Sequence, residues 1–321
     1  MRILVTGGLG FIGSHLTQRL LEMGNQVTII DNESTGLIEN VSDFINTPNL
    51  TIHRATILDE KLLDNIFKKV DYVFHLAAAV GVFNIVKNPI SSMVTNIHGT
   101  ENVLKLALKH GVPVFLTSSS EVYGKNTSNS LAETDDRVIG SPSILRWSYS
   151  EAKAIDESLA YAYFIEHNLE TRIVRFFNTV GPRQLGSYGM VVPRFVQAAI
   201  SNEPIHIYGS GNQTRCFAHV LDVVDAIVLV AFSANTIGRT VNIGNNEEIS
   251  MIDLAHKVIS YTKSGSDIVF TPYSEVYGKD FEDMERRVPN IQLINQLVGW
   301  SPKRDLNVII ADISAEMNRN P

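Results

Sequence analysis

A tyrosine and a lysine four residues apart, Tyr149 and Lys153, are the side chains best placed for proton chemistry. They open an apolar-periodic run that predicts a long helix, and positions i and i+4 of a helix share one face. A phenol has an ordinary pKa of about 10, and a nearby ammonium favours the phenolate. We therefore expect Lys153 to lower the pKa of Tyr149, so that Tyr149 takes a proton from a hydroxyl while a hydride leaves the same carbon. The same spacing also arises by chance, as an exposed aromatic beside a solvated lysine.

The composition is that of a globular enzyme. The 321 residues are 44% apolar and 19% charged, and the net charge of −7 argues against a general nucleic-acid-binding protein. Cys216 is the only cysteine, which excludes an internal disulfide and fits a reducing cytosol. No apolar stretch reaches the ~18 residues that span a bilayer, and a strand pattern from Arg2 leaves no room for a signal peptide. The histidines show no metal-ligand spacing. We expect a cytoplasmic protein with no metal, membrane or nucleic-acid partner.

A glycine-rich turn follows the first predicted strand, at residues 3–5, and leads into an amphipathic helix. The turn contains three spaced glycines, Gly7, Gly10 and Gly13. Such glycines let the backbone approach a pyrophosphate at a helix N-terminus. The second strand ends at Asp31 and Asn32, and an acid there accepts hydrogen bonds from a ribose 2′-hydroxyl and repels the 2′-phosphate of NADP. This order predicts that the protein binds NAD.

Strands and helices alternate through the first half of the chain. Further strands are predicted near 51–55, 72–74, 114–116 and 172–176, and helices near 60–69, 90–110 and 148–167. This rhythm predicts an α/β fold with a doubly wound parallel (Rossmann) sheet, whose ligands bind beyond the strand C-termini. We place an NAD-binding domain at 1–177 and a smaller C-terminal substrate-binding lobe at 178–321, with helices near 191–201, 220–232 and 250–262. Some later strands, such as one at 240–243, are expected to return to the sheet.

Two of these strands run into segments suited to a site. The strand at 72–74 is followed by small residues, where the backbone can pass close to a cofactor. The strand at 114–116 leads to Ser119, Ser120 and Glu121, which place protic groups at the same edge. A serine-rich turn is also common as a merely solvated loop.

These pieces, taken in order, resemble the extended short-chain dehydrogenase/reductase family that modifies nucleotide sugars. The matching segments cover essentially the whole chain: TGGLGFIGSH, DN at 31–32, HLAAA, SSSEVYG, YSEAK, FFNTVGPR, and YGSGNQTR followed by DVVDA. The resemblance implies that Tyr149 removes the proton of the sugar C4 hydroxyl. It also implies that Lys153 binds the nicotinamide ribose and that Ser119 hydrogen-bonds the reacting oxygen. NAD would stay bound and be used transiently.

The resemblance also implies the residues that line the two ligand sites. The NAD site is expected to contain Gly7, Gly10, Phe11, Ile12, Gly13, Asp31, Asn32, Ile57, Leu76, Ala77, Ala78, Asn96, Tyr149, Lys153 and Phe176. The nucleotide-sugar site is expected to contain Arg146, Asn178, Arg183, Val192, Tyr208 and Arg215. Arginine suits diphosphate because its planar fork meets phosphate oxygens in pairs. Relatives commonly pair the helices at 90–110 and 148–167 into a four-helix dimer interface, so a homodimer is expected.

The reaction we favour is decarboxylation of UDP-glucuronate. Uronic-acid decarboxylases share an S-x-E motif, matched at 119–121, an R-W-x-Y-x-x-x-K block, matched at 146–153, and an R-x-P block, matched at 287–289. Oxidation of C4 makes a β-keto acid that loses carbon dioxide readily. Arg287 would hold the departing carboxylate or help to protonate the enolate, with Ser120 and Glu121 assisting. An exposed arginine before a helix-starting proline is the structural alternative for Arg287.

Other outcomes share the first step. A 4-epimerase needs only room for the 4-keto sugar to turn, and the segments 183–186 and 192–195 are closer to epimerases. A 4,6-dehydratase usually carries Asp-Glu after its Ser/Thr, where this chain has Ser120. A non-catalytic NAD-binding sensor is a further alternative, although such proteins usually lose the tyrosine or the lysine.

The chain departs from the decarboxylases at three positions. Ile85 and Phe281 each stand where those enzymes carry a tyrosine in the sugar pocket. Thr56 stands where an aspartate commonly meets adenine. The first two changes remove hydroxyl groups from the expected glucuronate site, and the third alters the adenine end.

Overall fold

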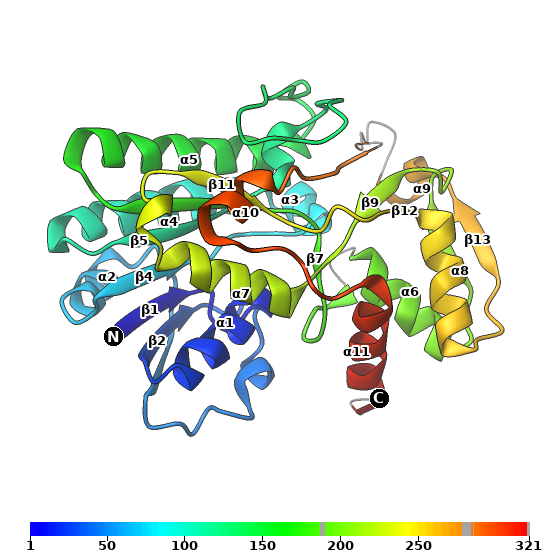
Figure 1. The fold of residues 1–321 in the computed structure, drawn as a ribbon, viewed down its shortest axis with the longest axis horizontal. Coiled ribbons are helices and arrows are strands. Elements are labelled where there is room, and N and C mark those ends of the chain that lie inside the picture. Colours follow the sequence, from blue (N-terminus) through cyan, green and yellow to red (C-terminus); the bar gives the residue numbers. More distant parts are fainter. Residues whose placement is uncertain (187–189, 278–283, 285, 320–321) are drawn as a thin grey trace.

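The computed structural model describes residues 1–186, 190–277, 284 and 286–319. Its largest element is a seven-stranded parallel sheet in the order β11-β6-β5-β4-β1-β2-β3 (Figure 1). The strands are β1 (Arg2–Thr6), β2 (Gln26–Asp31), β3 (Leu50–Arg54), β4 (Tyr72–His75), β5 (Val114–Ser119), β6 (Thr171–Phe176) and β11 (Thr240–Ile243). The order reverses at β1, so the predicted doubly wound sheet is confirmed. β11 returns from the second half of the chain, as expected.

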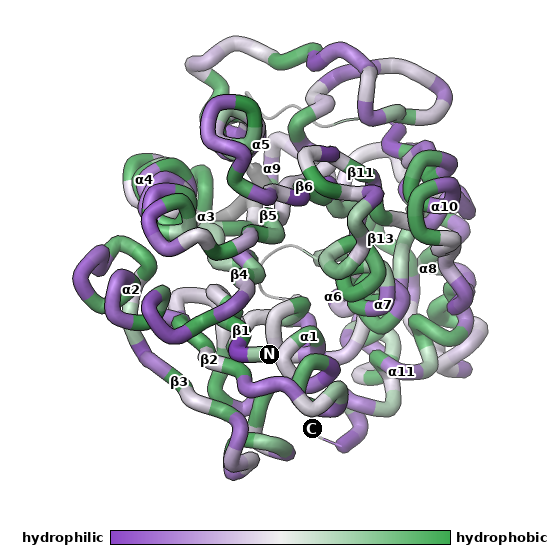
Figure 2. Tube along the Cα trace, turned by 60° about the vertical axis from the view of Figure 1, so that its left-hand side comes forward, coloured by the Kyte–Doolittle hydropathy of each residue, from purple (hydrophilic) through white to green (hydrophobic). Residues whose placement is uncertain are grey.

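Helices cover both faces of this sheet because successive residues of each strand point to opposite sides. Leu4 and Val73 pack under one helical layer, whereas Ile3 and Phe74 pack under the other. The first layer consists of α2 (Glu60–Phe67), α4 (Pro89–His110) and α5 (Trp147–His167), and the second of α1 (Phe11–Glu22), α7 (Val220–Ala231) and α10 (Gln292–Val298). Figure 2 shows the strands between these layers. Along the described residues, none of the helices combines the length and apolar character needed to cross a bilayer.

The C-terminal lobe has a core of its own. It is formed by α6 (Val191–Ile200), α8 (Met251–Thr262), α11 (Leu306–Arg319) and the pair β8 (Ile205–Tyr208) and β13 (Ile268–Thr271). Val192 is fully buried in this core beside Phe195. Its side chain belongs to the apolar stripe of α6 and does not line the cavity described below, and its contact with the substrate stays a prediction.

Short elements connect the sheet and the lobe. The two-residue strands β7 (Thr179–Val180) and β10 (Ala218–His219) pair in parallel, and β9 (Thr214–Cys216) pairs with β12 (Glu248–Ser250) in antiparallel. The short helices are η1 (Ile38–Val41), α3 (Val82–Lys87), η2 (Ser120–Tyr123), η4 (Ala234–Thr236) and α9 (Tyr273–Tyr277). Of these, η2 directly extends β5 and carries Ser120 and Glu121 to the edge of the sheet.

The glycine turn between β1 and α1 brings the backbone close to the loop after β4. Gly7 has φ +73°, and a Cβ at this residue would lie 2.8 Å from the nitrogen of Ala77. A Cβ at Gly13 would lie 2.0 Å from the carbonyl oxygen of Gly7. Any side chain at either position would force these segments apart, so the glycines are required by the packing of the turn itself.

Candidate active site

A cavity of about 510 Å³ lies at the carboxyl ends of β1, β4, β5 and β6, where they face the C-terminal lobe. All of the predicted catalytic residues line it, namely Ser119, Ser120, Glu121, Tyr149, Lys153 and Arg287. The predicted NAD and nucleotide-sugar residues line it too, except for Asn96 and Val192. Residues far apart in the sequence therefore meet at one site. Of the three departures from the decarboxylases, Ile85 and Thr56 line the cavity, and Phe281 lies outside the described residues.

Asn96 acts on the site through the backbone. It is buried in α4, and its amide accepts a hydrogen bond from the nitrogen of Ala79 at 2.7 Å and donates one to the oxygen of Ala79 at 3.2 Å. These two bonds hold the loop that follows β4 beside the glycine turn. The side chain of Asn96 thus supports a loop that lines the cavity, and the contact with NAD that the resemblance implies for it stays a prediction.

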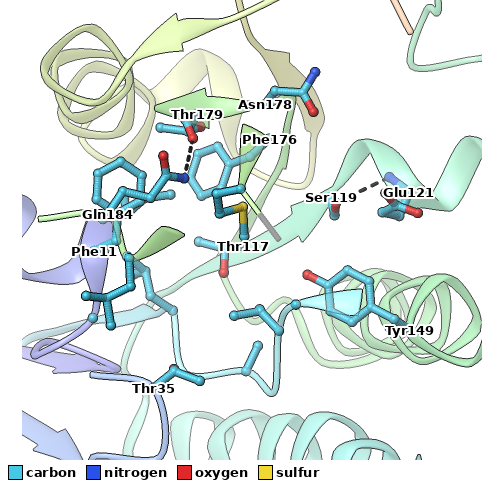
Figure 3. A pocket seen from close by; sticks show the side chains of 18 of the residues that line it. Phe11, Thr35, Thr117, Ser119, Glu121, Tyr149, Phe176, Asn178, Thr179 and Gln184 are labelled. Carbon is cyan, nitrogen blue, oxygen red and sulfur yellow. Dashed lines mark hydrogen bonds between the residues drawn. The ribbon is translucent and has the colours of Figure 1, made fainter. Parts of the chain in front are cut away.

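Tyr149 projects from the first turn of α5 into the cavity, and its hydroxyl faces the interior on the same side as Ser119 and Glu121 (Figure 3). Desolvation raises the pKa of Tyr149, the charges of Glu121 and Asp156 raise it further, and a hydrogen bond with Ser119 opposes the rise. The expected lowering of this pKa by Lys153 is therefore not what the structure shows.

Besides this desolvation, the partners of Lys153 bear on the difference. Its side chain is 2% exposed, and its ammonium donates to the carbonyl oxygen of Thr117 at 3.0 Å and to Oδ2 of Asp156 at 3.2 Å. Because a carboxylate compensates the positive charge within a few ångströms, the field that reaches Tyr149 is weaker than that of an isolated ammonium. The four-residue spacing correctly predicted that Tyr149 and Lys153 share one face of the helix. The pairing of the lysine with Asp156 became visible only in the folded site.

Glu121 is held between two arginines. Its Oε2 lies 2.6 Å from Nη1 of Arg146, and its Oε1 lies 2.8 Å from Nη2 of Arg287. Nη1 of Arg287 also donates to the hydroxyl of Ser120 at 3.3 Å. Desolvation favours a neutral Glu121, but Arg287 and Arg146 outweigh it and lower the pKa of Glu121 to about 2. Arg287 is 6% exposed, so the alternative of an exposed helix-start arginine is wrong.

These three charged side chains form one cluster. Two guanidinium groups flank the carboxylate of Glu121, and Arg287 also meets Ser120. The cluster lines the same cavity as Tyr149. The planar guanidinium of Arg287 has the geometry to meet a carboxylate on a bound molecule.

The other predicted arginines lie at different ends of the cavity. Arg183 donates from Nη2 to Oε1 of Gln18 at 2.8 Å, and its guanidinium lies 5.8 Å from the ring centroid of Phe44. It therefore lies against α1, where it lines the cavity, and its contact with the nucleotide sugar stays a prediction. Arg215 lines the cavity from β9, in the lobe.

The sequence analysis missed several lining residues. Arg194 stacks on the ring of Tyr208 at 3.8 Å, and both line the cavity. The helical spacing of α6 could have indicated Arg194, because Val192 belongs to the buried stripe of this helix and Arg194 does not. Gln184 also lines the cavity and donates to the carbonyl oxygen of Thr179 at 3.0 Å (Figure 3). No sequence motif predicts this contact.

The residues at the sheet end of the cavity fit NAD. The glycine turn allows the close backbone approach that a pyrophosphate needs. Asp31 lies where β2 ends, and its carboxylate is fixed by the backbone nitrogens of Leu9 at 3.0 Å and Glu33 at 2.8 Å. Ile57 and Leu76 add apolar lining.

Comparison with known proteins settles the family. The family model described as GDP-mannose 4,6 dehydratase matches residues 4–313. The chain belongs to the extended short-chain dehydrogenase/reductase family. Within it, the chain is 39% identical to a UDP-N-acetyl-alpha-D-glucosaminuronate decarboxylase of Bacillus cytotoxicus over 94% of this chain and 92% of that protein. It is 36% identical to UDP-glucuronic acid decarboxylase 1 of Xenopus tropicalis over 94% of this chain and 68% of that protein.

Solved structures of the family agree with the fold. The UDP-glucose 4-epimerase of Thermotoga maritima, solved with UDP-glucose, superposes with a TM-score of 0.89 and 29% identity, and the match covers 100% of this chain and 99% of that one. Epimerases and dehydratases of this extended dehydrogenase fold have also been solved with NAD. This chain is accordingly an NAD-dependent enzyme that acts on a nucleotide sugar.

Proposed function

We propose that this extended dehydrogenase decarboxylates a UDP-hexuronate, with UDP-glucuronate as the first candidate substrate. The observation that carries the proposal is the cluster of Arg287, Glu121 and Arg146 beside Ser120, in the same cavity as Tyr149. The buried planar guanidinium of Arg287 suits a carboxylate on the sugar, which a uronate carries and a neutral hexose lacks. The relatives named UDP-glucuronic acid and UDP-N-acetylglucosaminuronate decarboxylases support the same class of substrate.

Each side chain of the site has a separate role in this reaction. Ser119 and Tyr149 hold the C4 hydroxyl, and Tyr149, in its phenolate form, takes the proton of this hydroxyl as C4 becomes a ketone. When bound, NAD would supply the redox chemistry, as the acceptor of the C4 hydride in this step and as its donor when the ketone is reduced at the end. The resulting β-keto acid breaks its bond from C5 to the carboxylate, releases carbon dioxide, and leaves an enolate that must gain one proton at C5. Arg287 faces the carboxylate before it departs.

Glu121 has a supporting role in this scheme. Its pKa of about 2 keeps it a carboxylate at neutral pH, so it is a poor proton donor to the enolate. Its two oxygens instead fix the orientation of Arg146 and Arg287. Glu121 therefore positions the guanidinium groups that receive the substrate.

A 4-epimerase is the second candidate. Ile85 is buried at the cavity wall, where the uronate-specific relatives are expected to present a tyrosine hydroxyl. An apolar residue at this position holds the sugar less tightly through hydrogen bonds, which favours a 4-keto sugar that turns before it is reduced.

The nature of the product decides between these functions. The purified protein is incubated with UDP-glucuronate, UDP-N-acetylglucosaminuronate, UDP-glucose and UDP-N-acetylglucosamine, and the products are followed by mass spectrometry. Loss of the mass of carbon dioxide from either uronate supports the proposal. Loss of the mass of water means dehydration, and an isomer of equal mass means epimerisation. Either of those outcomes, without decarboxylation, overturns the proposal.

We further infer that the protein is a cytoplasmic homodimer that pairs α4 and α5 with the same helices of a second copy. Both helices carry exposed apolar side chains, including Ile90 at 79%, Tyr161 at 54% and Ile165 at 58% exposure. Figure 2 shows hydrophobic segments on both of these helices. A self-complementary pairing would cover them. The single, buried Cys216 fits a reducing compartment.

Replacing Ile165 with glutamate is expected to convert the dimer to a monomer, because a charge would be buried in an apolar interface. Light scattering coupled to size-exclusion chromatography measures the mass. Phe270→Glu is the control, since Phe270 is 53% exposed on β13, away from both helices. A wild-type monomer, or an Ile165→Glu dimer, contradicts the inference.

A further inference from the structure

Asp156 is a buried acid on the active-site face of α5. It follows Lys153 by three residues and Tyr149 by seven, so the three side chains share one face of the helix. Asp156 is 0% exposed, and its Oδ2 accepts a hydrogen bond from Lys153 at 3.2 Å. Thr100 of α4 contacts the same carboxylate. Lys153 lines the cavity, whereas Asp156 stands behind it.

A carboxylate is costly to bury unless a cation compensates it, and the same holds for an ammonium. Asp156 and Lys153 satisfy this condition for each other. The pair differs from an ordinary structural ion pair because Lys153 also borders the space that Tyr149 enters. The negative charge of Asp156 therefore acts at the hydroxyl of Tyr149, where it disfavours the phenolate.

The other charged groups around this pair are already balanced or distant. His75 of β4 bonds to Thr100 at 3.1 Å, and desolvation, aided by the charge of Lys153, lowers its pKa to about 3, so it is neutral. Glu157 is paired with Arg175 of β6 at 2.7 Å. Glu121 is paired with Arg146 and Arg287. The charged residues of α4 that lie nearest in sequence to Thr100 point to solvent or to α2: His98, Glu101 and Lys105.

We propose that Asp156 is a positioning residue of this enzyme, which compensates the charge of Lys153, holds its ammonium at the Thr117 carbonyl, and limits how strongly the lysine favours the Tyr149 phenolate. The proposal rests on the proposed function only in taking Tyr149 as the base. Removal of the carboxylate should lower the pKa of Tyr149. Without the carboxylate, the uncompensated ammonium stabilises the phenolate, so Tyr149 deprotonates at lower pH.

The test is a titration of the holoenzyme carrying Asp156→Asn. The phenolate of Tyr149 is followed by ultraviolet absorbance, as the difference between each protein and its Tyr149→Phe counterpart. We expect the midpoint to fall by roughly one pH unit or more, as a unit charge at this range in a partly polar interior would produce. The rising limb of the pH–rate profile should move in the same direction.

Glu151→Gln is the matched control, because it removes one negative charge from the same helix at an exposed site paired with Arg137. Its midpoint should stay at the wild-type value. Asp156→Ser provides a second variant if the asparagine protein does not fold. A midpoint in the Asp156 variants that equals or exceeds the wild-type value, or an equal shift in the control, overturns the proposal.

The two proposals fail in different ways. If no uronate loses carbon dioxide, the proposed function is wrong, yet the absorbance titration needs no substrate and still decides the role of Asp156. If decarboxylation occurs and the midpoint does not move, Asp156 is only a structural partner of Lys153.

Discussion

Replacing Tyr149 with phenylalanine is expected to lower turnover by about a thousand-fold, within the range that general acid–base groups contribute. The change removes only the hydroxyl that faces the cavity beside Ser119. The ring remains, so the packing of α5 and the binding of NAD should be preserved. Steady-state rates with the active uronate and the NAD content of the purified protein measure the two effects.

Tyr161→Phe serves as the control for this substitution, because Tyr161 lies on the same helix and is 54% exposed. Its activity should match the wild type. Full activity in Tyr149→Phe would refute the role of Tyr149 as base. Loss of activity together with loss of bound NAD would instead point to a structural defect of the site.

Replacing Arg287 with methionine is expected to lower kcat/KM for a UDP-uronate by about a hundred-fold or more. Methionine keeps much of the volume but removes the guanidinium that meets Glu121 at 2.8 Å and Ser120 at 3.3 Å. The cluster then loses the guanidinium that would meet the carboxylate of the substrate, while Arg146 still pairs with Glu121. Removal of one partner of a buried ion pair also destabilises a protein, so thermal unfolding is measured alongside.

Arg286→Met is the matched control, since Arg286 is the neighbouring arginine, is 42% exposed and pairs with Glu248 at the surface. It should decarboxylate normally. Arg287→Lys separates the effect of charge from that of shape. Lysine restores the positive charge but not the planar guanidinium, so partial activity is expected. Decarboxylation by Arg287→Met at the wild-type rate would remove Arg287 from the mechanism.

The sheet and its cofactor end were predictable because their signals are local. Continuous apolar runs mark strands that are buried on both faces, and Gly7 and Gly13 sit in a turn whose geometry depends on a few adjacent residues. Asp31 ends the second strand, as the βαβ rhythm requires. Even β11 followed from its apolar run, although its place at the sheet edge beside β6 did not.

Two residues of the predicted nucleotide-sugar site have side-chain directions that the family segments do not state. Val192 belongs to the apolar stripe of α6 and is buried in the core of the lobe. Arg183 has a left-handed backbone at φ +66° and a bond to Gln18, which turn it towards α1. The helix face of Val192 and the backbone conformation of Arg183 set these directions, and a sequence motif states neither.

The sequence by itself determined the parallel sheet, the NAD site and the shared helical face of Tyr149 and Lys153, because each depends on spacing within one or two adjacent elements. Only the tertiary structure decided the charge state of the site. It joined Glu121 to Arg287 across 166 positions of the chain, and it buried Asp156 behind the lysine. Charge compensation depends on distances of a few ångströms between side chains, and the fold alone sets those distances.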